Sequence, residues 1–238
     1  MISRVMATKR SQWEKCSRLL LLNNVPVLSQ LVSVVEKLAA NIQNFPSEEK
    51  FRCINTDNKA IKSKIIDCSG GLEILLALGF IPSGYSSTGA KVLKLNFGEL
   101  EENNGNDSSL HLLSEGLSWL RDTYTTCKHY ADIICTSSGV TVSPCCEVQV
   151  QLRLPTAVIV KGGFMRSETL QEVKNYACCF FSEENAKTVT LSFSHEAKEI
   201  GPALLERTFD SLGLTGRESF IVLSSTEDPS HVFEKVSM

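Results

Sequence analysis

The stretch that most constrains the fold is residues 47–80, which reads SEEKFRCINTDNKAIKSKIIDCSGGLEILLALGF. The acidic residues at its start suit a helix N-terminus, and residues 55–58 have the composition of a turn. Ser69-Gly70-Gly71 interrupts the chain before an apolar helix, and Gly79 stands where a left-handed cap is expected to end that helix. The spacing therefore predicts one compact unit built from several short elements.

This stretch resembles the PUB domain family. The resemblance lies in Glu49-Lys50-Phe51-Arg52, then Asn58, then a Gly-Gly-led apolar helix that ends in Gly79-Phe80. Phe51 stands where the family usually has Tyr. The resemblance implies a mainly helical α/β domain with a small sheet, whose groove binds the acidic C-terminal tail of the hexameric AAA ATPase valosin-containing protein.

The resemblance assigns five residues to that groove. They are Asn41, Lys50, Phe51, Gly79 and Phe80. Such a site needs a cation for the acidic side chains, an apolar wall for an aromatic ring and an amide to fix the peptide backbone. Each residue also has an ordinary explanation, because Asn41 can cap its helix, Lys50 can be a solvated charge, and the two phenylalanines can belong to the core.

The second half of the chain has a different residue pattern. Apolar residues alternate with polar ones over residues 148–154 and again over 189–193, which predicts half-buried strands. A helix is predicted from Ser167, and its inner face contains Leu170, Val173 and Tyr176. The order of these elements predicts a ubiquitin-like β-grasp, so the fold class is α+β with two domains.

This half resembles the UBX domain family in Gln151–Pro155, Gly163-Phe164, Ser167–Leu170 and Thr208–Leu214. That family enters a cleft of the ATPase's N-terminal domain through an Arg on the first strand and a Phe-Pro-Arg loop. The matching residues here are Arg153 and Phe193-Ser194-His195. The loop lacks the rigid Pro of the family. His195 stands in place of the Arg, whose planar guanidinium holds several hydrogen-bond donors in a fixed geometry, so weak or absent binding is expected there.

The predicted organisation has five segments. They are a basic arm or the start of a first helix at 1–18, a PUB-like domain at 19–126, a linker rich in Ser, Thr and Gly at 127–146, a UBX-like β-grasp at 147–226 and a tail at 227–238. Residues 1–100 contain 13 basic and 8 acidic side chains, and residues 101–238 contain 11 and 19. This asymmetry indicates two domains with different partners.

The sequence indicates a protein without catalytic activity. An alternative is a thiol-dependent hydrolase, because Cys127, His129 and Asp132 lie close together in sequence, although nothing in a linker would fix their geometry. No C-x-x-C pair occurs, so neither a metal nor another cofactor is expected, and the nine cysteines are read as reduced thiols.

The expected function is therefore that of an adaptor of valosin-containing protein in ubiquitin-dependent degradation or trafficking. A further alternative is a binding module of the ubiquitin pathway with a different partner. Neither half is basic enough for nucleic acid to be the main ligand, and no apolar run reaches membrane-spanning length. A cytoplasmic or nuclear location is expected.

Overall fold

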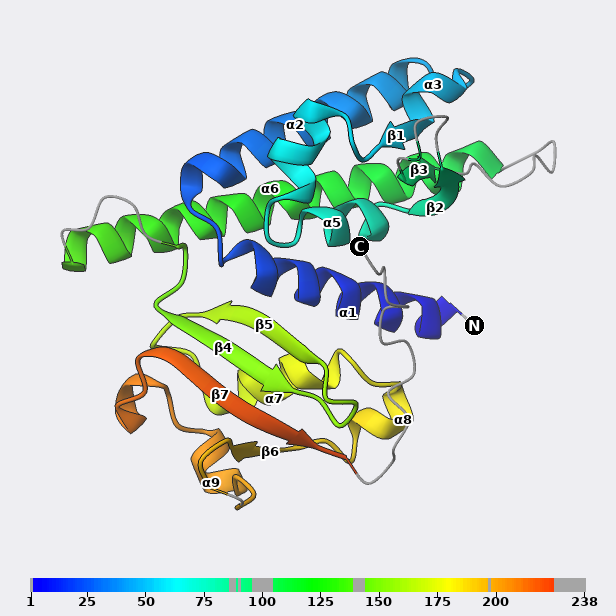
Figure 1. The fold of residues 1–238 in the computed structure, drawn as a ribbon. Helices are drawn as coiled ribbons and strands as arrows, with labels where there is room; N and C mark the ends of the chain where they lie inside the picture. Colours follow the sequence, from blue (N-terminus) through cyan, green and yellow to red (C-terminus); the bar gives the residue numbers. More distant parts are fainter. Residues whose placement is uncertain are drawn as a thin grey trace. The chain divides into compact units, whose positions relative to one another are not determined.

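The computed structural model describes residues 2–85, 89, 91–95, 105–138, 144–196 and 198–224. The chain forms two compact units, of which one comprises residues 1–22 and 144–238 and the other comprises residues 23–143. Figure 1 shows the elements of both units. The PUB-like unit is therefore inserted between two segments of the β-grasp unit, and the predicted α+β fold class is confirmed.

The inserted unit combines two long helices with a small sheet. In chain order its elements are α2 (Val25–Asn44), α3 (Glu49–Arg52), β1 (Cys53–Asn55), α4 (Lys59–Ile61), the π-helix η1 (Lys62–Ile66), α5 (Gly71–Ala77), β2 (Phe80–Tyr85), β3 (Lys91–Leu95) and α6 (Gly105–Ser138). Helix α2 packs against α6, and the strands form an antiparallel sheet in the order β1-β3-β2.

Helix α2 begins at a side-chain cap and ends near a proline. The Val27 N–H donates to Asn24 Oδ1 at 3.0 Å, and Pro26 lies in the first turn, where a missing N–H costs nothing. Its apolar face, including Leu31 and Ile42, is buried. Among the described residues, α2 alone is long and apolar enough to cross a membrane by length and composition, and its buried stripe is that of a core helix.

Gly71 opens α5 at a point where no larger residue fits. A Cβ atom on Gly71 would lie 1.8 Å from the carbonyl oxygen of Ile65 in η1. The chain therefore needs glycine here because two backbone segments approach each other closely, and not because of a left-handed conformation. This contact fixes α5 against η1, which in turn positions the Gly79 end of α5.

The β-grasp unit has a mixed four-stranded sheet. Its elements are α1 (Ile2–Leu20), β4 (Val148–Arg153), β5 (Ile159–Phe164), α7 (Leu170–Cys178), α8 (Glu183–Ala186), β6 (Thr190–Phe193), α9 (Pro202–Leu205), the 3-10 helix η2 (Asp210–Leu212) and β7 (Gly216–Leu223). The strand order is β5-β4-β7-β6, and the central strands β4 and β7 are parallel. Helix α7 packs on one face through buried residues such as Leu170, Val173 and Tyr176, as predicted.

Helix α1 lies along β5 and belongs to the β-grasp unit (Figure 1). The Arg18 guanidinium lies 4.1 Å from the Phe164 ring centroid, and its Nη1 lies 2.6 Å from Glu168 Oε1. Gly162 and Gly163 allow this approach, because a Cβ on Gly163 would lie 2.7 Å from Leu21 Cβ. Of the two alternatives for residues 1–18, the structure shows the start of a first helix, and the predicted boundary at residue 19 differs from that of the unit, which includes residues 1–22.

The predicted linker at 127–146 also differs from the structure. Residues 127–138 form the last turns of α6, a helix of 34 residues, because Cys127 and Ala131 continue its buried stripe, whereas the Ser, Thr and Gly content of residues 127–146 favoured a linker. Residues 139–143 and the predicted tail at 227–238 lie outside the described residues.

Candidate peptide-binding site

Two phenylalanines stack at the end of α2. The Phe45 N–H donates to the Asn41 carbonyl at 3.0 Å, which ends the helix. The Phe45 and Phe51 ring centroids are 5.3 Å apart with an interplanar angle of 29°. Phe45 is 48% exposed and Phe51 is half-buried, so this pair presents an aromatic surface to solvent.

Lys50 lies beside the stacked pair and Lys94 pairs with Glu49, two residues before Phe51, so each of these cations has an acidic partner. Lys50 Nζ lies 4.8 Å from the Phe51 ring centroid and 2.5 Å from Glu48 Oε2. Lys94 Nζ, from β3, lies 2.5 Å from Glu49 Oε1. The hydrogen bond and the charge of Lys94 hold the pKa of the Glu49 carboxyl below its usual value. The site therefore carries several charges, and each of the two lysine cations is neutralised by a neighbouring glutamate.

Asn41 is exposed in the last turn of α2. Its backbone carbonyl caps the helix, whereas its side-chain amide makes no hydrogen bond with a described residue. The amide can therefore donate to and accept from a peptide backbone beside the stacked rings. Asn58, by contrast, accepts from the N–H groups of Ala60 and Ile61 and caps α4.

The Gly79-Phe80 pair has a different place from the one expected. Gly79 ends α5 with a φ of 98°, and a Cβ there would lie 3.2 Å from Leu95 Cδ1. Phe80 is only 2% exposed and belongs to the core. Its ring cannot line a surface groove in this structure, so the expected role of Phe80 is corrected to that of a core residue.

The next residue, Ile81, reaches the surface instead. It is 47% exposed and pairs with Lys94, which in turn pairs with Cys53 across the small sheet. Because successive residues of a strand point to opposite faces, Ile81 lies on the face opposite to Phe80. The apolar side chain of Ile81 thus lies next to the Lys94 cation on the same face of the small sheet.

Sequence reasoning missed Phe45, Ile81 and Lys94. Phe45 stands directly before Pro46, a position that by itself indicates only the end of a helix, and the available signal was its apolar side chain six residues before Phe51. Lys94 comes from a strand more than 40 residues away, and only the pairing of β1 with β3 brings it to Glu49.

The residues expected in a UBX-like site do not share one face of the sheet. Phe193 pairs with Phe220 and packs on the core, with ring centroids 5.4 Å apart. Arg153 pairs with Ile221, the residue after Phe220 in β7. Its side chain therefore lies on the face of the sheet opposite to that of Phe193. Ser194 and His195 are exposed, and the Ser194 N–H donates to the Ser219 carbonyl.

The thiol site considered from the sequence is not assembled. Cys127 is buried in α6 at 1% exposure, whereas His129 and Asp132 are exposed on that helix. Residues two apart on a helix do not face each other, so His129 cannot serve the Cys127 thiol. No group of three or more metal-ligating side chains occurs among the described residues.

Comparisons with known proteins agree with the PUB-like unit. A family model described as "PUB domain" matches residues 27–109. None of the curated proteins matches this sequence.

Solved structures similar to the chain are ubiquitin-like. Ubiquitin from Caldiarchaeum subterraneum is 15% identical, with a TM-score of 0.27, and the match covers 34% of this chain and 95% of that one. The ubiquitin-like domain of an Arabidopsis thaliana protein is 17% identical, with a TM-score of 0.28 and coverages of 34% and 80%. A second determination of that protein is 18% identical, with a TM-score of 0.26 and coverages of 34% and 88%.

These scores are low, so the β-grasp assignment depends on the strand order described above. The PUB assignment has two supports, the matched model and the short elements between α2 and β3. Residues 27–109 therefore match the PUB domain model, and this range lies within the unit of residues 23–143.

Proposed function

We propose that this protein is a non-catalytic adaptor that binds the acidic C-terminal tail of a valosin-containing protein type AAA ATPase. The observation that carries the proposal is the solvent-exposed stack of Phe45 and Phe51 beside Lys50 and Asn41, within the residues that match the PUB domain. Lys94 and Ile81 extend the surface. We call these six residues the α2-end site.

The α2-end site supplies the three groups that such a tail requires. The stacked rings offer an apolar wall for an aromatic side chain of the ligand. Lys50 and Lys94 offer cations for its carboxylates, in exchange for their present partners Glu48 and Glu49. The Asn41 amide can pair with the backbone of an extended peptide.

The PUB and β-grasp units together resemble UBX domain-containing protein 6 and its relatives. We assign the ATPase interaction to the PUB-like unit alone, because Arg153 and Phe193 lie on opposite faces of the β-grasp sheet. Action in ubiquitin-dependent degradation or trafficking, in the cytoplasm or nucleus, belongs to the same proposal. A ubiquitin-pathway module with another partner is the competing function, and the following titration separates the two.

The test is titration of a synthetic peptide with the ATPase tail sequence into the full chain, measured by calorimetry. Phe51→Ala should weaken binding about tenfold or more, since buried aromatic anchors dominate small interfaces. Tyr85→Ala is the matched control, because Tyr85 is an exposed aromatic residue of the same unit at 72% exposure. Normal binding by folded Phe51→Ala, or an equal loss in Tyr85→Ala, would refute the proposed site.

A further inference from the structure

One face of the β-grasp sheet points away from α7, and its side chains follow from the strand register. Those not covered by other segments are Gln149, Gln151 and Arg153 of β4; Ile159 and Lys161 of β5; Arg217, Ser219, Ile221 and Leu223 of β7; and Thr190 of β6, because Leu21 lies against Gly163 and Ser192 is 2% exposed. We call this set the open sheet face. It contains three basic and no acidic side chains, although residues 144–224 as a whole contain eight basic and ten acidic ones.

The three cations of the open sheet face are not neutralised by the protein. Arg153, Lys161 and Arg217 are exposed, and none forms an ion pair with a residue that the structure describes. Elsewhere in the same unit Arg18 pairs with Glu168, and Arg166 pairs with Asp210. Three cations on one sheet surface raise the local potential and attract acidic groups.

Glutamates lie at two borders of this face. Glu199 forms an isolated bridge with Ser192, at the β6 edge of the sheet. Glu147 directly precedes β4, and its N–H donates to the Phe164 carbonyl at the end of β5. Arg153 pairs with Ile159 at the opposite ends of these two strands, so that end of the open sheet face is the part suited to carboxylates.

Apolar side chains accompany these cations. Ile159 is 58% exposed and Leu223 is 44% exposed, which places both among the few exposed large apolar residues of the described chain. Ile159 and Ile221 flank Arg153 in the strand pairing. Exposed aliphatic residues grouped around a cation are typical of an interaction surface, whereas single scattered ones need no explanation.

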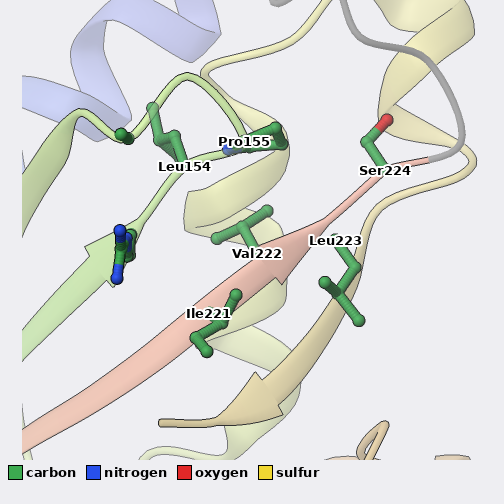
Figure 2. A pocket seen from close by; sticks show the side chains of 8 residues that line it. Leu154, Pro155, Ile221, Val222, Leu223 and Ser224 are labelled. Atoms are coloured by element: carbon green, nitrogen blue, oxygen red, sulfur yellow. The ribbon is translucent and has the colours of Figure 1, made fainter. Parts of the chain in front are cut away.

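A pocket of about 270 Å³ opens where β4 ends and β7 continues. The pairing of β4 with β7 stops at Arg153 and Ile221, whereas β7 extends to Leu223. Figure 2 shows Leu154 and Pro155 in the turn after β4, with residues 221–224 along the end of β7. The pocket has mainly aliphatic walls, and the guanidinium-bearing Arg153 lies at its rim.

The turn that forms one wall of the pocket is held by its own backbone. The Ala157 N–H donates to the Leu154 carbonyl and the Leu154 N–H donates to the Val158 carbonyl, both at 2.9 Å. Ala157 has a φ of 63°, a conformation that a residue with a side chain seldom adopts. The wall is thus fixed before any ligand arrives, which lowers the entropic cost of binding.

We propose that the open sheet face binds an acidic peptide segment of a partner protein. An aliphatic side chain of the segment enters the pocket beside Leu154, Pro155 and Leu223. Its carboxylates lie near Arg153, Lys161 and Arg217. The aliphatic walls distinguish this ligand from one anchored by an aromatic ring at the α2-end site, so the proposal stands independently of the function proposed above.

The test is a selection from a displayed library of random 12-residue peptides on the immobilised full chain. Acidic peptides with Leu, Ile or Val should be enriched, and the enrichment should fall about tenfold or more on Arg153→Glu and on Leu223→Ser. Lys187→Glu is the matched control, because it reverses an exposed charge outside the open sheet face. Phe51→Ala should leave these peptides enriched, which separates them from ligands of the α2-end site.

Several results would overturn the proposal. One is that no enriched peptide depends on Arg153 or Leu223, and another is that the dependent peptides are basic or disappear on Phe51→Ala. A third is that removal of residues 225–238 increases the enrichment, because the chain's own tail would then be the occupant. Amide exchange of β4 and β7 shows that each variant is folded, and Lys161→Glu replaces Arg153→Glu if that variant fails to fold.

Discussion

The α2-end site and the open sheet face both combine cations with apolar side chains, and they differ in how far the cations are already neutralised. Lys50 and Lys94 each lie 2.5 Å from a glutamate. Arg153 and Lys161 have no ion-pair partner among the described residues. An acidic ligand must therefore displace a carboxylate at the first surface but not at the second.

This difference shows that a count of cations is a poor guide to what a surface binds. At the α2-end site the exposed ion pairs contribute little to stability, so specificity there has to come from the Phe45 and Phe51 rings. At the open sheet face the charges themselves can steer a ligand, and binding there should be more sensitive to salt.

The largest expected effect tests whether the two surfaces belong to units that fold separately. Gly71→Ala would place a Cβ atom 1.8 Å from the Ile65 carbonyl oxygen, and the backbone would have to move. We expect the free energy of unfolding of the PUB-like unit to fall by about 3 kcal/mol or more. Hydrogen exchange followed by mass spectrometry should show protection lost in residues 25–95 and kept in residues 148–223.

Gly201→Ala is the control, because nothing lies within 4 Å of a Cβ at that position. It should change stability by less than about 1 kcal/mol. Equal loss of protection in both units after Gly71→Ala would show that the two units unfold together as one cooperative structure.

The next effect tests the assignment of α1 to the unit that bears the open sheet face. Arg18 is largely buried, pairs with Glu168 at 2.6 Å and lies over the Phe164 ring. Its removal leaves the Glu168 carboxylate with less compensation, so Arg18→Ala should destabilise the β-grasp unit by about 2–3 kcal/mol. Chemical denaturation measures this loss of stability, and amide hydrogen exchange shows in which unit it occurs.

Arg166→Ala removes an exposed pair with Asp210 at 2.5 Å and is the matched control. Its expected cost is about 0–1 kcal/mol. Similar costs for the two variants would mean that α1 adds little to the β-grasp unit.

A further effect appears at alkaline pH and should be larger in the β-grasp unit than in the PUB-like unit, where burial raises the pKa of the Cys68 thiol. Burial raises the pKa of the Cys146 thiol to about 12. A raised pKa means that the folded state favours the protonated thiol, so this stability is complete below the unfolded pKa near 9 and is lost as pH rises from there toward 12. The loss should be about 1.4 kcal/mol per pH unit within that window.

Denaturation midpoints between pH 8 and pH 11 measure this dependence. Cys146→Ala should reduce the slope without abolishing it, because burial also raises the pKa values of Cys178 and Cys179. A slope unchanged by Cys146→Ala would assign the alkaline transition to other groups.

The smallest effect tests charge compensation at the α2-end site. Glu48→Gln releases Lys50, so affinity for the acidic tail peptide should rise by less than about threefold at low salt and return to the wild-type value at high salt. Titration at two ionic strengths measures it. Weaker binding after Glu48→Gln would show that Glu48 contacts the ligand and that the compensation argument is wrong.

Local patterns in the sequence predicted the regular elements well. The apolar helix that ends before Gly79, the helix with Leu170 and Val173 on its inner face, and the alternation in β4 are all confirmed, because periodic burial is encoded within each segment. The ubiquitin-like strand order followed from these elements in sequence.

Features that depend on contacts between distant segments could not be predicted. Whether Phe80 lines a groove or fills the core depends on which face of β2 packs inward, and this is decided by its pairing with Leu95. The partner of α1 is more than 120 residues away, and nothing within residues 1–18 identifies it. Helix α6 continued through residues 127–138 because buried neighbours outweighed weak local propensity.

The insertion of the PUB-like unit also sets an order of events during synthesis. Arg18 and Glu168 are 150 residues apart, and a ribosome adds about 5–20 residues per second, so α1 waits about 8–30 s before Glu168 is made. The intervening unit has time to fold first, while the apolar side of α1 is available to chaperones. Helix α1 must therefore be kept from wrong associations until β5, the strand that it packs against, has been translated.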